Sequence, residues 1–182
     1  MKQTVKQDMK QNTKQNAKNQ ACVSFDARTV NEGFARMVVM GFMMEMNPTM
    51  DELQDVKTAV SEAVTNAIIH GYEICECEEN VKVTGDEDDE SGTHEKMQCP
   101  QVRMKCFRDG RRLTVVIEDD GVGIADIEEA RQPFFTTKPE MERSGMGFAF
   151  METFMDEVRV VSGLGKGTRV EMTKYIKETD EQ

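Results

Sequence analysis

The stretch S-E-A-V-T-N-A-I-I-H-G, Ser61 to Gly71, carries three polar side chains along an otherwise apolar helical pattern. Glu62, Asn66 and His70 are spaced i, i+4, i+8, so an α-helix places them in one ridge. The apolar positions of the same helix point elsewhere and predict a separate core face; they are Leu53, Val56, Val60, Val64 and Ala67. The small and apolar neighbours of the ridge favour a covered cleft over a solvated face. A helix with incidental polar positions is the alternative at this point.

The composition predicts one compact domain with appendages. The chain has 182 residues, 38% of them hydrophobic, and a formal net charge of -11. Such an acidic chain is a poor match for direct binding to nucleic acid or to an anionic membrane, and we expect a metal-nucleotide or a protein as partner. The sequence has neither the run of about 18 to 20 apolar residues of a membrane span nor the apolar centre of a signal peptide. We therefore expect a cytoplasmic protein.

Two segments fall outside the predicted core. Residues 1–20 form a degenerate Lys/Gln repeat with almost nothing to bury, so we expect a disordered tail and a folded domain over 21–182. Nine acidic residues and one lysine between positions 73 and 90 predict a solvated acidic insertion at about 73–100. Its Cys75, Cys77, His94 and Cys99 could hold zinc, but they lack a tight CxxC pair, which favours free thiols. The odd total of five cysteines also fits reduced thiols.

The remaining pattern predicts alternating helices and strands. An edge strand begins near Ala21, and Thr49-Met50-Asp51-Glu52 is a capping box that opens the helix carrying the ridge. The expected helices lie at 31–46, 50–70 and 126–131 and from about 147 onward, with an irregular stretch at 133–144. Asp109-Gly110 joins strands at 102–107 and 113–118, and a closing hairpin pairs 158–161 with 168–172.

Three polar features together suggest a nucleotide site. Asp119-x-Gly121-x-Gly123 puts a carboxylate at a strand end, where it can accept a hydrogen bond from an exocyclic amine beside glycines that admit a flat base. Gly145-x-Gly147 stands at a helix start, which favours phosphate. Asn66 offers a hard oxygen for Mg²⁺. Each feature alone is weak, because short glycine patterns are common in turns.

The order of these motifs resembles the Bergerat, or GHKL, ATP-binding fold that gyrase and histidine kinases share. Four longer strings resemble one branch, the anti-sigma-F family of endospore-forming bacteria, whose members are serine protein kinases; they are S-E-A-V-T-N-A-I-I-H-G-Y, D-G-V-G-I, A-R-Q-P-F-F-T-T-K-P-E and E-R-S-G-M-G-F. The similarity covers about 24–174 without the acidic insertion. It implies an α+β fold, a two-layer sandwich of a mixed, mostly antiparallel sheet with helices on one face, and ATP and Mg²⁺ as cofactors.

The resemblance also implies roles for individual residues. Glu62 matches the general base that takes the proton from a serine hydroxyl, and Asn66 matches the Mg²⁺ ligand. Asp119 would bind the adenine amino group, with Gly121 and Gly123 beneath the base, and Thr168 would support the adenine pocket from the last hairpin. The lid over the phosphates would span 131–147, with nucleotide-binding residues Thr136, Thr137, Lys138, Arg143, Ser144, Gly145 and Gly147. For His70 we favour packing or hydrogen bonding over catalysis.

The family implies protein partners as well. These are a sigma factor of the F type, an anti-anti-sigma protein as the phosphorylated substrate, and a second copy of the chain, with Arg36 of the first helix on the partner surface. A general-stress anti-sigma kinase is an alternative, as is a nucleotide-gated binding protein without turnover. A catalytic domain like that of a histidine kinase would need a phosphoacceptor histidine on a dimerisation helix, and neither His70 nor His94 has that setting.

Overall fold

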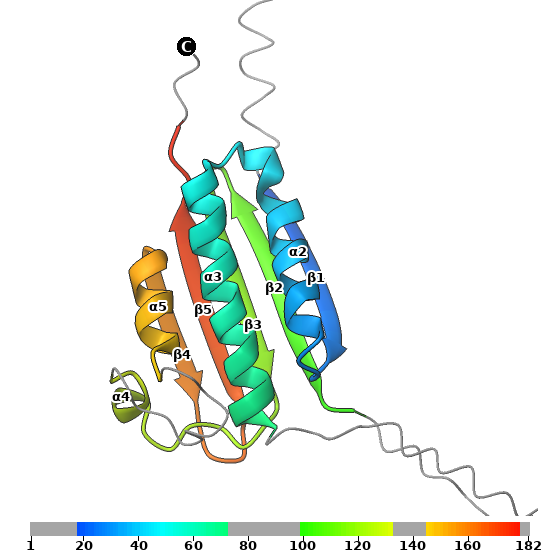
Figure 1. The fold of residues 1–182 in the computed structure, drawn as a ribbon, viewed down its shortest axis with the longest axis vertical. Coiled ribbons are helices and arrows are strands. Elements are labelled where there is room, and N and C mark those ends of the chain that lie inside the picture. Colours follow the sequence, from blue (N-terminus) through cyan, green and yellow to red (C-terminus); the bar gives the residue numbers. More distant parts are fainter. Residues whose placement is uncertain (1–17, 73–98, 133–144, 179–182) are drawn as a thin grey trace, which may run out of the picture.

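One antiparallel sheet and a layer of helices make up the fold (Figure 1). The structure is a computed structural model and describes residues 18–72, 99–132 and 145–178. Its strands follow the order β1-β2-β3-β5-β4; they are β1 (Lys18–Asp26), β2 (Gln101–Asp109), β3 (Arg112–Asp119), β4 (Glu157–Ser162) and β5 (Thr168–Tyr175). The α+β two-layer prediction is confirmed. Every strand pairing within the described ranges is antiparallel, so the parallel pair that a mixed sheet would contain is not seen there.

Helices α2, α3 and α5 lie against the same face of the sheet, and the short α4 lies outside that layer, below α5 in this view (Figure 1). They are α2 (Asn31–Met43) with the 3₁₀ turn η1 (Met44–Met46), α3 (Met50–Asn66) with the π-helical turn η2 (Ala67–Gly71), the short α4 (Ile127–Ala130), and α5 (Gly147–Phe154). Asn47, at φ 47°, follows α2 and η1 and ends this first helical segment at the predicted break. In the part of the chain that is described, no helix is both long and apolar enough to cross a bilayer.

Strand β1 is an edge strand, as predicted, and it begins earlier than expected. It pairs with β2 from Lys18 opposite Asp109 to Asp26 opposite Gln101. The last three residues of the predicted tail, 18–20, therefore belong to the sheet, and 1–17 lie outside the described residues. The sequence missed this start because Lys18, Asn19 and Gln20 are exposed and carry no apolar alternation.

Helix α3 forms the centre of the core. Its predicted apolar stripe is buried throughout, with exposed fractions of 7% or less. The predicted capping box is present, because Thr49 N–H donates to Glu52 Oε2 over 2.8 Å and Glu52 N–H donates to Thr49 Oγ1 over 3.2 Å. Glu52 also accepts the N–H of Lys177 over 2.8 Å. The start of α3 is thus fixed to the end of the described chain.

The last turn of this helix is π-helical, where we had expected an α-helix to His70. A π-turn places one extra residue in the turn, and such turns are frequent at functional sites. Here the turn ends at Gly71, whose carbonyl accepts the N–H of Val122 over 2.9 Å. A Cβ on Gly71 would lie 3.0 Å from Asp119 Cγ. The turn therefore presses the end of the ridge helix against the loop that follows β3.

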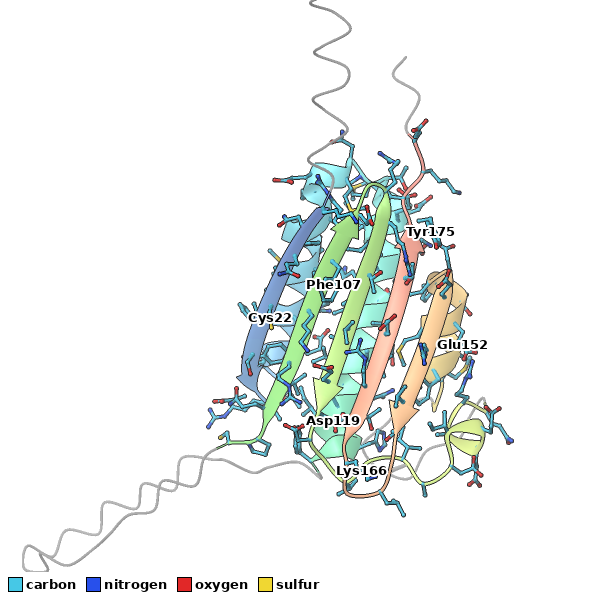
Figure 2. All side chains as sticks on the ribbon, turned by 180° about the vertical axis from the view of Figure 1, so that it is seen from behind. Cys22, Phe107, Asp119, Glu152, Lys166 and Tyr175 are labelled. Atoms are coloured by element: carbon cyan, nitrogen blue, oxygen red, sulfur yellow. The ribbon has the colours of Figure 1, made fainter. Side chains whose placement is uncertain are left out.

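The opposite face of the sheet is open and carries charged side chains (Figure 2). Glu118 accepts from Lys105 Nζ over 2.6 Å and from Arg169 over 2.5 Å. Partial burial alone would raise the pKa of Glu118, but these two cations lower it below its ordinary value. Residues from three adjacent strands are thereby linked across the solvent side, where cross-strand ion pairs support the register.

Candidate active site

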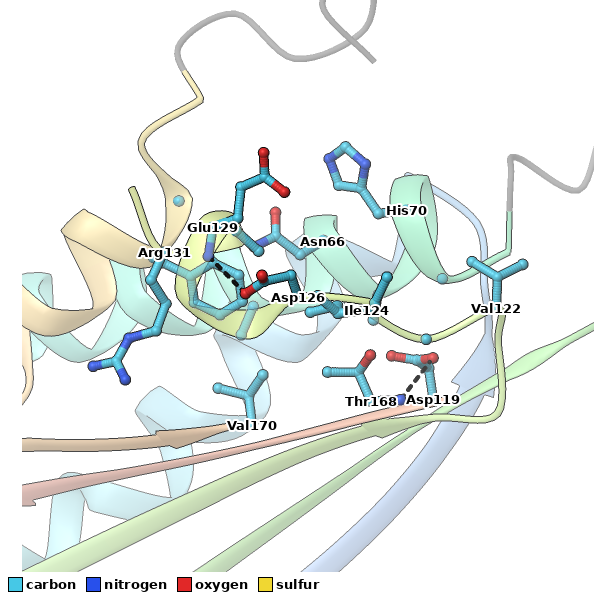
Figure 3. Close-up of a pocket in the computed structure, with 18 of the residues that line it drawn as sticks. Asn66, His70, Asp119, Val122, Ile124, Asp126, Glu129, Arg131, Thr168 and Val170 are labelled. Atoms are coloured by element: carbon cyan, nitrogen blue, oxygen red, sulfur yellow. Dashed lines mark hydrogen bonds between the residues drawn. The ribbon is translucent and has the colours of Figure 1, made fainter. Parts of the chain in front are cut away.

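A cavity of about 490 Å³ opens where α3 and β3 end and where β5 and α5 begin (Figure 3). It brings together residues from all the separate sequence motifs: Asn66, His70, Asp119, Gly123, Gly145, Gly147 and Thr168. Aliphatic side chains supply much of the remaining wall, among them Ile117, Val122, Ile124, Leu164 and Val170. Such a mixture of apolar walls and a few convergent polar groups is typical of a small-molecule site.

Asp119 is the polar anchor at one end of the cavity. Its side chain is buried, at 6% exposure. The N–H groups of Gly121 and Thr168 donate to its Oδ1 over 2.9 and 3.2 Å, and these two bonds leave Oδ2 as an acceptor for a ligand. Burial raises the pKa of this carboxyl, although the two N–H donors oppose the shift. An amino group on a flat ring is therefore a suitable ligand.

The loop after Asp119 needs glycine at two places. A Cβ on Gly121 would lie 2.0 Å from the carbonyl oxygen of Gly71. Gly123 has φ 73°, and a Cβ there would lie 2.0 Å from the carbonyl oxygen of Gly163. Both positions exclude any side chain, because real Cβ contacts are never so short. The D-x-G-x-G pattern thus lets this loop pack between the end of α3 and the β4–β5 hairpin. Gly121 itself does not line the cavity.

Gly147 brings the helix start of α5 against the ridge on α3. A Cβ on Gly147 would lie 3.0 Å from Asn66 Nδ2 and 3.3 Å from Glu62 Oε2. The free N–H groups of the first turn of α5 therefore face the same region as these two side chains. The positive end of a helix beside a carboxylate and an amide is an arrangement that suits a phosphate with its counterion.

Asn66 carries an unsatisfied buried acceptor. Within the described residues its Oδ1 is the one buried side-chain oxygen or nitrogen that has no hydrogen-bond partner. Such a group is unfavourable unless a ligand completes it. A neutral amide oxygen is a hard ligand of the kind that Mg²⁺ accepts, and this cation takes its other ligands from water and phosphate. The residue therefore fits the predicted Mg²⁺ role.

The other predicted site residues have different outcomes. Glu62 lies beside Gly147 but not in the cavity wall. Arg36 lies on α2, where it pairs with Glu32. Thr136, Thr137, Lys138, Arg143 and Ser144 lie outside the described residues, as do Cys75, Cys77 and His94 of the suggested zinc set. Cys99 is a free thiol, and over 18–72, 99–132 and 145–178 no group of three or more potential metal ligands is found.

Sequence reasoning missed part of the cavity wall. Val122, Ile124, Leu164, Asp126 and Glu129 line it without having been assigned. Aliphatic residues in turns carry no motif that could have identified them. Asp126 could have been found as a helix cap, since its Oδ1 accepts the N–H of Glu129 over 3.1 Å at the start of α4.

Comparisons with known proteins identify the family of the chain. A model of the histidine kinase-like ATPase domain matches residues 23–174. An anti-sigma F factor of Geobacillus kaustophilus (strain HTA426) is 48% identical over 158 residues, which are 87% of this chain and 93% of that protein. One of Clostridium novyi (strain NT) is 43% identical over 162 residues, 89% of this chain and 98% of that protein.

A solved structure agrees in fold. The RsbU and RsbW domains of Rv1364c from Mycobacterium tuberculosis align with a TM-score of 0.54 at 16% identity, over 88% of this chain and 33% of that one. This chain thus spans about a third of the solved one, and the likeness concerns the fold alone. The family match and the two sequence relatives cover most of the chain. The chain therefore belongs to the anti-sigma F factors, within the family of histidine kinase-like ATPase domains.

Proposed function

We propose that the chain binds and inhibits a sporulation sigma factor of the F type, and that it uses Mg-ATP to phosphorylate a serine of an anti-anti-sigma protein. The observation that carries the proposal is the close approach of Gly147 to both Glu62 and Asn66, since a Cβ on Gly147 would lie 3.3 Å from Glu62 Oε2 and 3.0 Å from Asn66 Nδ2. It supports one site in which a helix start, a carboxylate and an unsatisfied amide oxygen meet beside the cavity.

The two ends of the cavity suggest how ATP is oriented. The adenine amino group would donate to Asp119 Oδ2, with the aliphatic wall against the ring. The phosphates would then extend toward Gly145 and Gly147, where the helix start of α5 offers N–H donors. Asn66 would hold Mg²⁺, which would neutralise phosphate charge and orient the phosphates.

Glu62 would act on the incoming serine. The serine oxygen forms a bond to the γ-phosphorus while the bond from that phosphorus to the ADP oxygen breaks, and Glu62 takes the serine proton. Its position next to Gly147 and one helical turn before Asn66 supports this role, because the base must lie close to the transferred group. Phosphoryl transfer depends mainly on positioning and on charge stabilisation.

Helix α2 is the proposed partner surface. Phe34 and Met37 on α2 and Met44 in the adjoining turn η1 are large apolar residues with exposed fractions of 47%, 67% and 57%. Arg36 lies among them, with its Nε 3.0 Å from Glu32 Oε1, and the hydroxyl of Ser61 on α3 donates to the same oxygen. We propose that this surface serves the protein contacts, including those of a homodimer.

Incubation with labelled ATP tests the proposal. The purified chain is mixed with an F-type sigma factor, an anti-anti-sigma protein, or both. We expect label on a serine of the anti-anti-sigma protein, and the chain bound to the sigma factor when that substrate is absent. Label on a histidine of the chain itself would instead identify a histidine-kinase activity. Nucleotide-dependent sigma binding without any transfer would contradict the kinase and leave a binding protein.

A further inference from the structure

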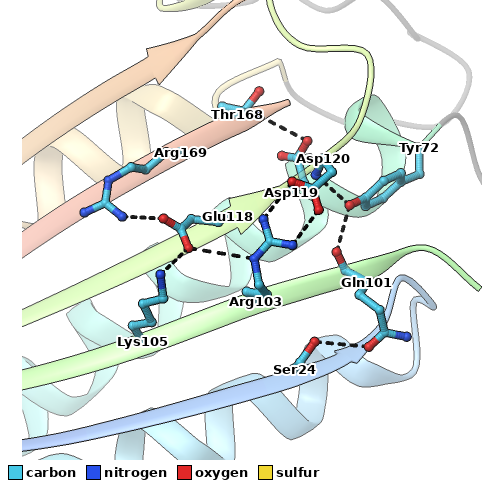
Figure 4. A network of polar contacts seen from close by, with 10 residues as sticks. All are labelled: Ser24, Tyr72, Gln101, Arg103, Lys105, Glu118, Asp119, Asp120, Thr168 and Arg169. Atoms are coloured by element: carbon cyan, nitrogen blue, oxygen red, sulfur yellow. Dashed lines mark hydrogen bonds and ion pairs between the residues drawn. The ribbon is translucent and has the colours of Figure 1, made fainter. Parts of the chain in front are cut away.

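A group of contacts on the outer side of the loop after β3 fixes that loop from three directions (Figure 4). Asp120, the residue next to Asp119, is held at both its main chain and its side chain. Its N–H donates to the hydroxyl of Tyr72 over 2.7 Å, and its carboxylate accepts two bonds from Arg103, over 2.5 and 2.7 Å. Tyr72 and Arg103 have no part in the ATP site as described so far.

The Tyr72 hydroxyl joins segments that are distant in sequence. It donates to the carbonyl oxygen of Gln101, 29 positions away at the start of β2, over 2.7 Å. Burial raises the pKa of this hydroxyl, which keeps its single proton in place for that bond. With the proton so used, the oxygen is free to accept from Asp120. One hydroxyl thus connects the end of the ridge helix, the start of β2 and the loop of Asp119.

Gly71 and Tyr72 hold the loop at two successive points. The Gly71 carbonyl accepts the N–H of Val122, and the Tyr72 hydroxyl accepts the N–H of Asp120. Arg103 adds a bidentate ion pair that lowers the pKa of Asp120 and restricts its side chain. The main chain on both sides of Gly121 is therefore fixed, and Gly121 supplies one of the two donors to Asp119 Oδ1.

The position of Asp119 Oδ2 matters for the choice of base. Adenine presents an amino group at ring position 6, whereas guanine presents a carbonyl oxygen there and an N–H at the neighbouring N1. A carboxylate held opposite position 6 accepts from adenine and repels guanine. A carboxylate that can shift along the ring edge can instead accept from guanine N1. Selectivity therefore depends on how rigidly the loop is held.

We propose that Tyr72 is a positioning residue for base selectivity: with Arg103 it holds the loop of Asp119 so that the site prefers adenine over guanine nucleotides. This rests on the proposed ATP site and adds residues that do not touch the nucleotide.

The test compares the two tyrosines of the chain. Tyr72→Phe removes the hydroxyl in question, and Tyr175→Phe removes one that contacts Glu157 at the opposite end of the sheet (Figure 2). Dissociation constants for ATP and GTP are measured by calorimetry on the full chain, together with thermal unfolding without nucleotide. Tyr72→Phe removes both hydrogen bonds of the hydroxyl, and we expect the less firmly held Asp119 to bind ATP about three- to tenfold more weakly, which corresponds to the loss of about one hydrogen bond between Asp119 and the adenine amino group. GTP binding should stay unchanged or improve, so that the ratio of ATP to GTP affinity becomes smaller. Tyr175→Phe should bind both nucleotides as the unchanged protein does.

Several outcomes would overturn the proposal. An unchanged ratio of ATP to GTP affinity in Tyr72→Phe, including an equal loss for both nucleotides with a lower melting temperature, would show a merely structural role. Arg103→Gln must narrow the ratio in the same direction, and it decides the matter alone if Tyr72→Phe does not fold. Failure of the unchanged protein to bind ATP would overturn the ATP site itself, and this inference with it.

Discussion

Replacing Asp119 with Asn should abolish most adenine binding while leaving the protein folded. In the native chain Oδ1 accepts the N–H groups of Gly121 and Thr168. An asparagine keeps its carbonyl oxygen there, which forces its NH₂ group into the place of Oδ2, opposite the adenine amine. A charge-assisted hydrogen bond worth about 1.5–3 kcal/mol is lost, or about 10- to 100-fold in affinity.

The same substitution should not destabilise the protein without nucleotide. Burial raises the pKa of Asp119, so its ionised form is less favourable in the folded than in the unfolded chain at neutral pH. A neutral amide removes that penalty and keeps both bonds at Oδ1. We therefore expect an unchanged or higher melting temperature, which separates a binding effect from misfolding.

Calorimetric titration with ATP and thermal unfolding provide the assay, with Asp109→Asn as the matched control. Asp109 is 64% exposed and pairs with Lys18 at the far end of the sheet. The control should bind ATP as the unchanged protein does. Unchanged ATP affinity in Asp119→Asn would remove this residue from the base pocket. A large fall in melting temperature would refute the argument that its carboxylate is held for ligand binding at the expense of stability.

Three further predictions concern the rest of the site and the core. Gly147→Ala places a methyl group 3.0 Å from Asn66 Nδ2, and the resulting small displacements should lower ATP affinity and reduce phosphoryl transfer about tenfold or more. Gly41→Ala, with open space around its Cβ, lies on the proposed partner surface and is therefore a control for ATP affinity alone; it should leave that affinity unchanged and stabilise α2 by about 0.5–1 kcal/mol. Equal ATP affinity in the two variants would contradict the close approach of Gly147 to Asn66. ATP affinity should be highest well above the raised pKa of Asp119 and should fall as the pH drops toward that pKa, with the fall beginning above the ordinary value of 3.8. The affinity of Asp119→Asn should not show this fall. Identical pH profiles of ATP affinity in the two proteins would exclude Asp119 as the titrating group. Burial alone would raise the pKa of Glu52, but the N–H groups of Lys177 and Thr49 lower it, so the stability that Glu52 contributes is present above the ordinary pKa of 4.5 and is lost as the pH falls through the lowered pKa. Glu52→Ala should reduce the free energy of unfolding, measured by chemical denaturation at neutral pH, by about 1–3 kcal/mol. An unchanged free energy of unfolding would refute the role of Glu52 in holding both Thr49 and Lys177.

The sequence predicted the fold well where the apolar periodicity agrees with residues that begin or end an element, such as helix caps and turn residues. The stripe of Val56, Val60 and Val64, the Thr49 capping box and the Asp109-Gly110 turn each specify a local structure, and each is present. The π-turn after Asn66 was not predictable, because the apolar period of the helix continues through it. Its last residue, Gly71, packs against the loop at Gly121, a tertiary contact that the local sequence does not specify.

The site shows the same division between local and tertiary information. Asp119, Gly123 and Asn66 carry chemistry or conformational demands that are visible in the sequence, and the structure brings them to one cavity. The lack of a hydrogen-bond partner at Asn66 Oδ1 depends on residues that are far apart in the chain. The same is true of the hydrogen bonds of Asp120 with Tyr72 and Arg103. Tyr72 ends one of the four strings that resemble the family, but nothing in its sequence position shows that its hydroxyl reaches Asp120 and Gln101.

The central claim is that Glu62 takes the proton of the incoming serine hydroxyl in the same site that binds ATP. The most direct measurement compares Glu62→Gln with Glu157→Gln, an exposed position on β4, in ATP titrations and in phosphorylation of the anti-anti-sigma protein. We predict that Glu62→Gln binds ATP nearly as well as the unchanged protein and loses at least about a hundredfold in transfer rate, while Glu157→Gln retains both. Transfer at the normal rate by Glu62→Gln, or loss of its ATP binding, would contradict the account.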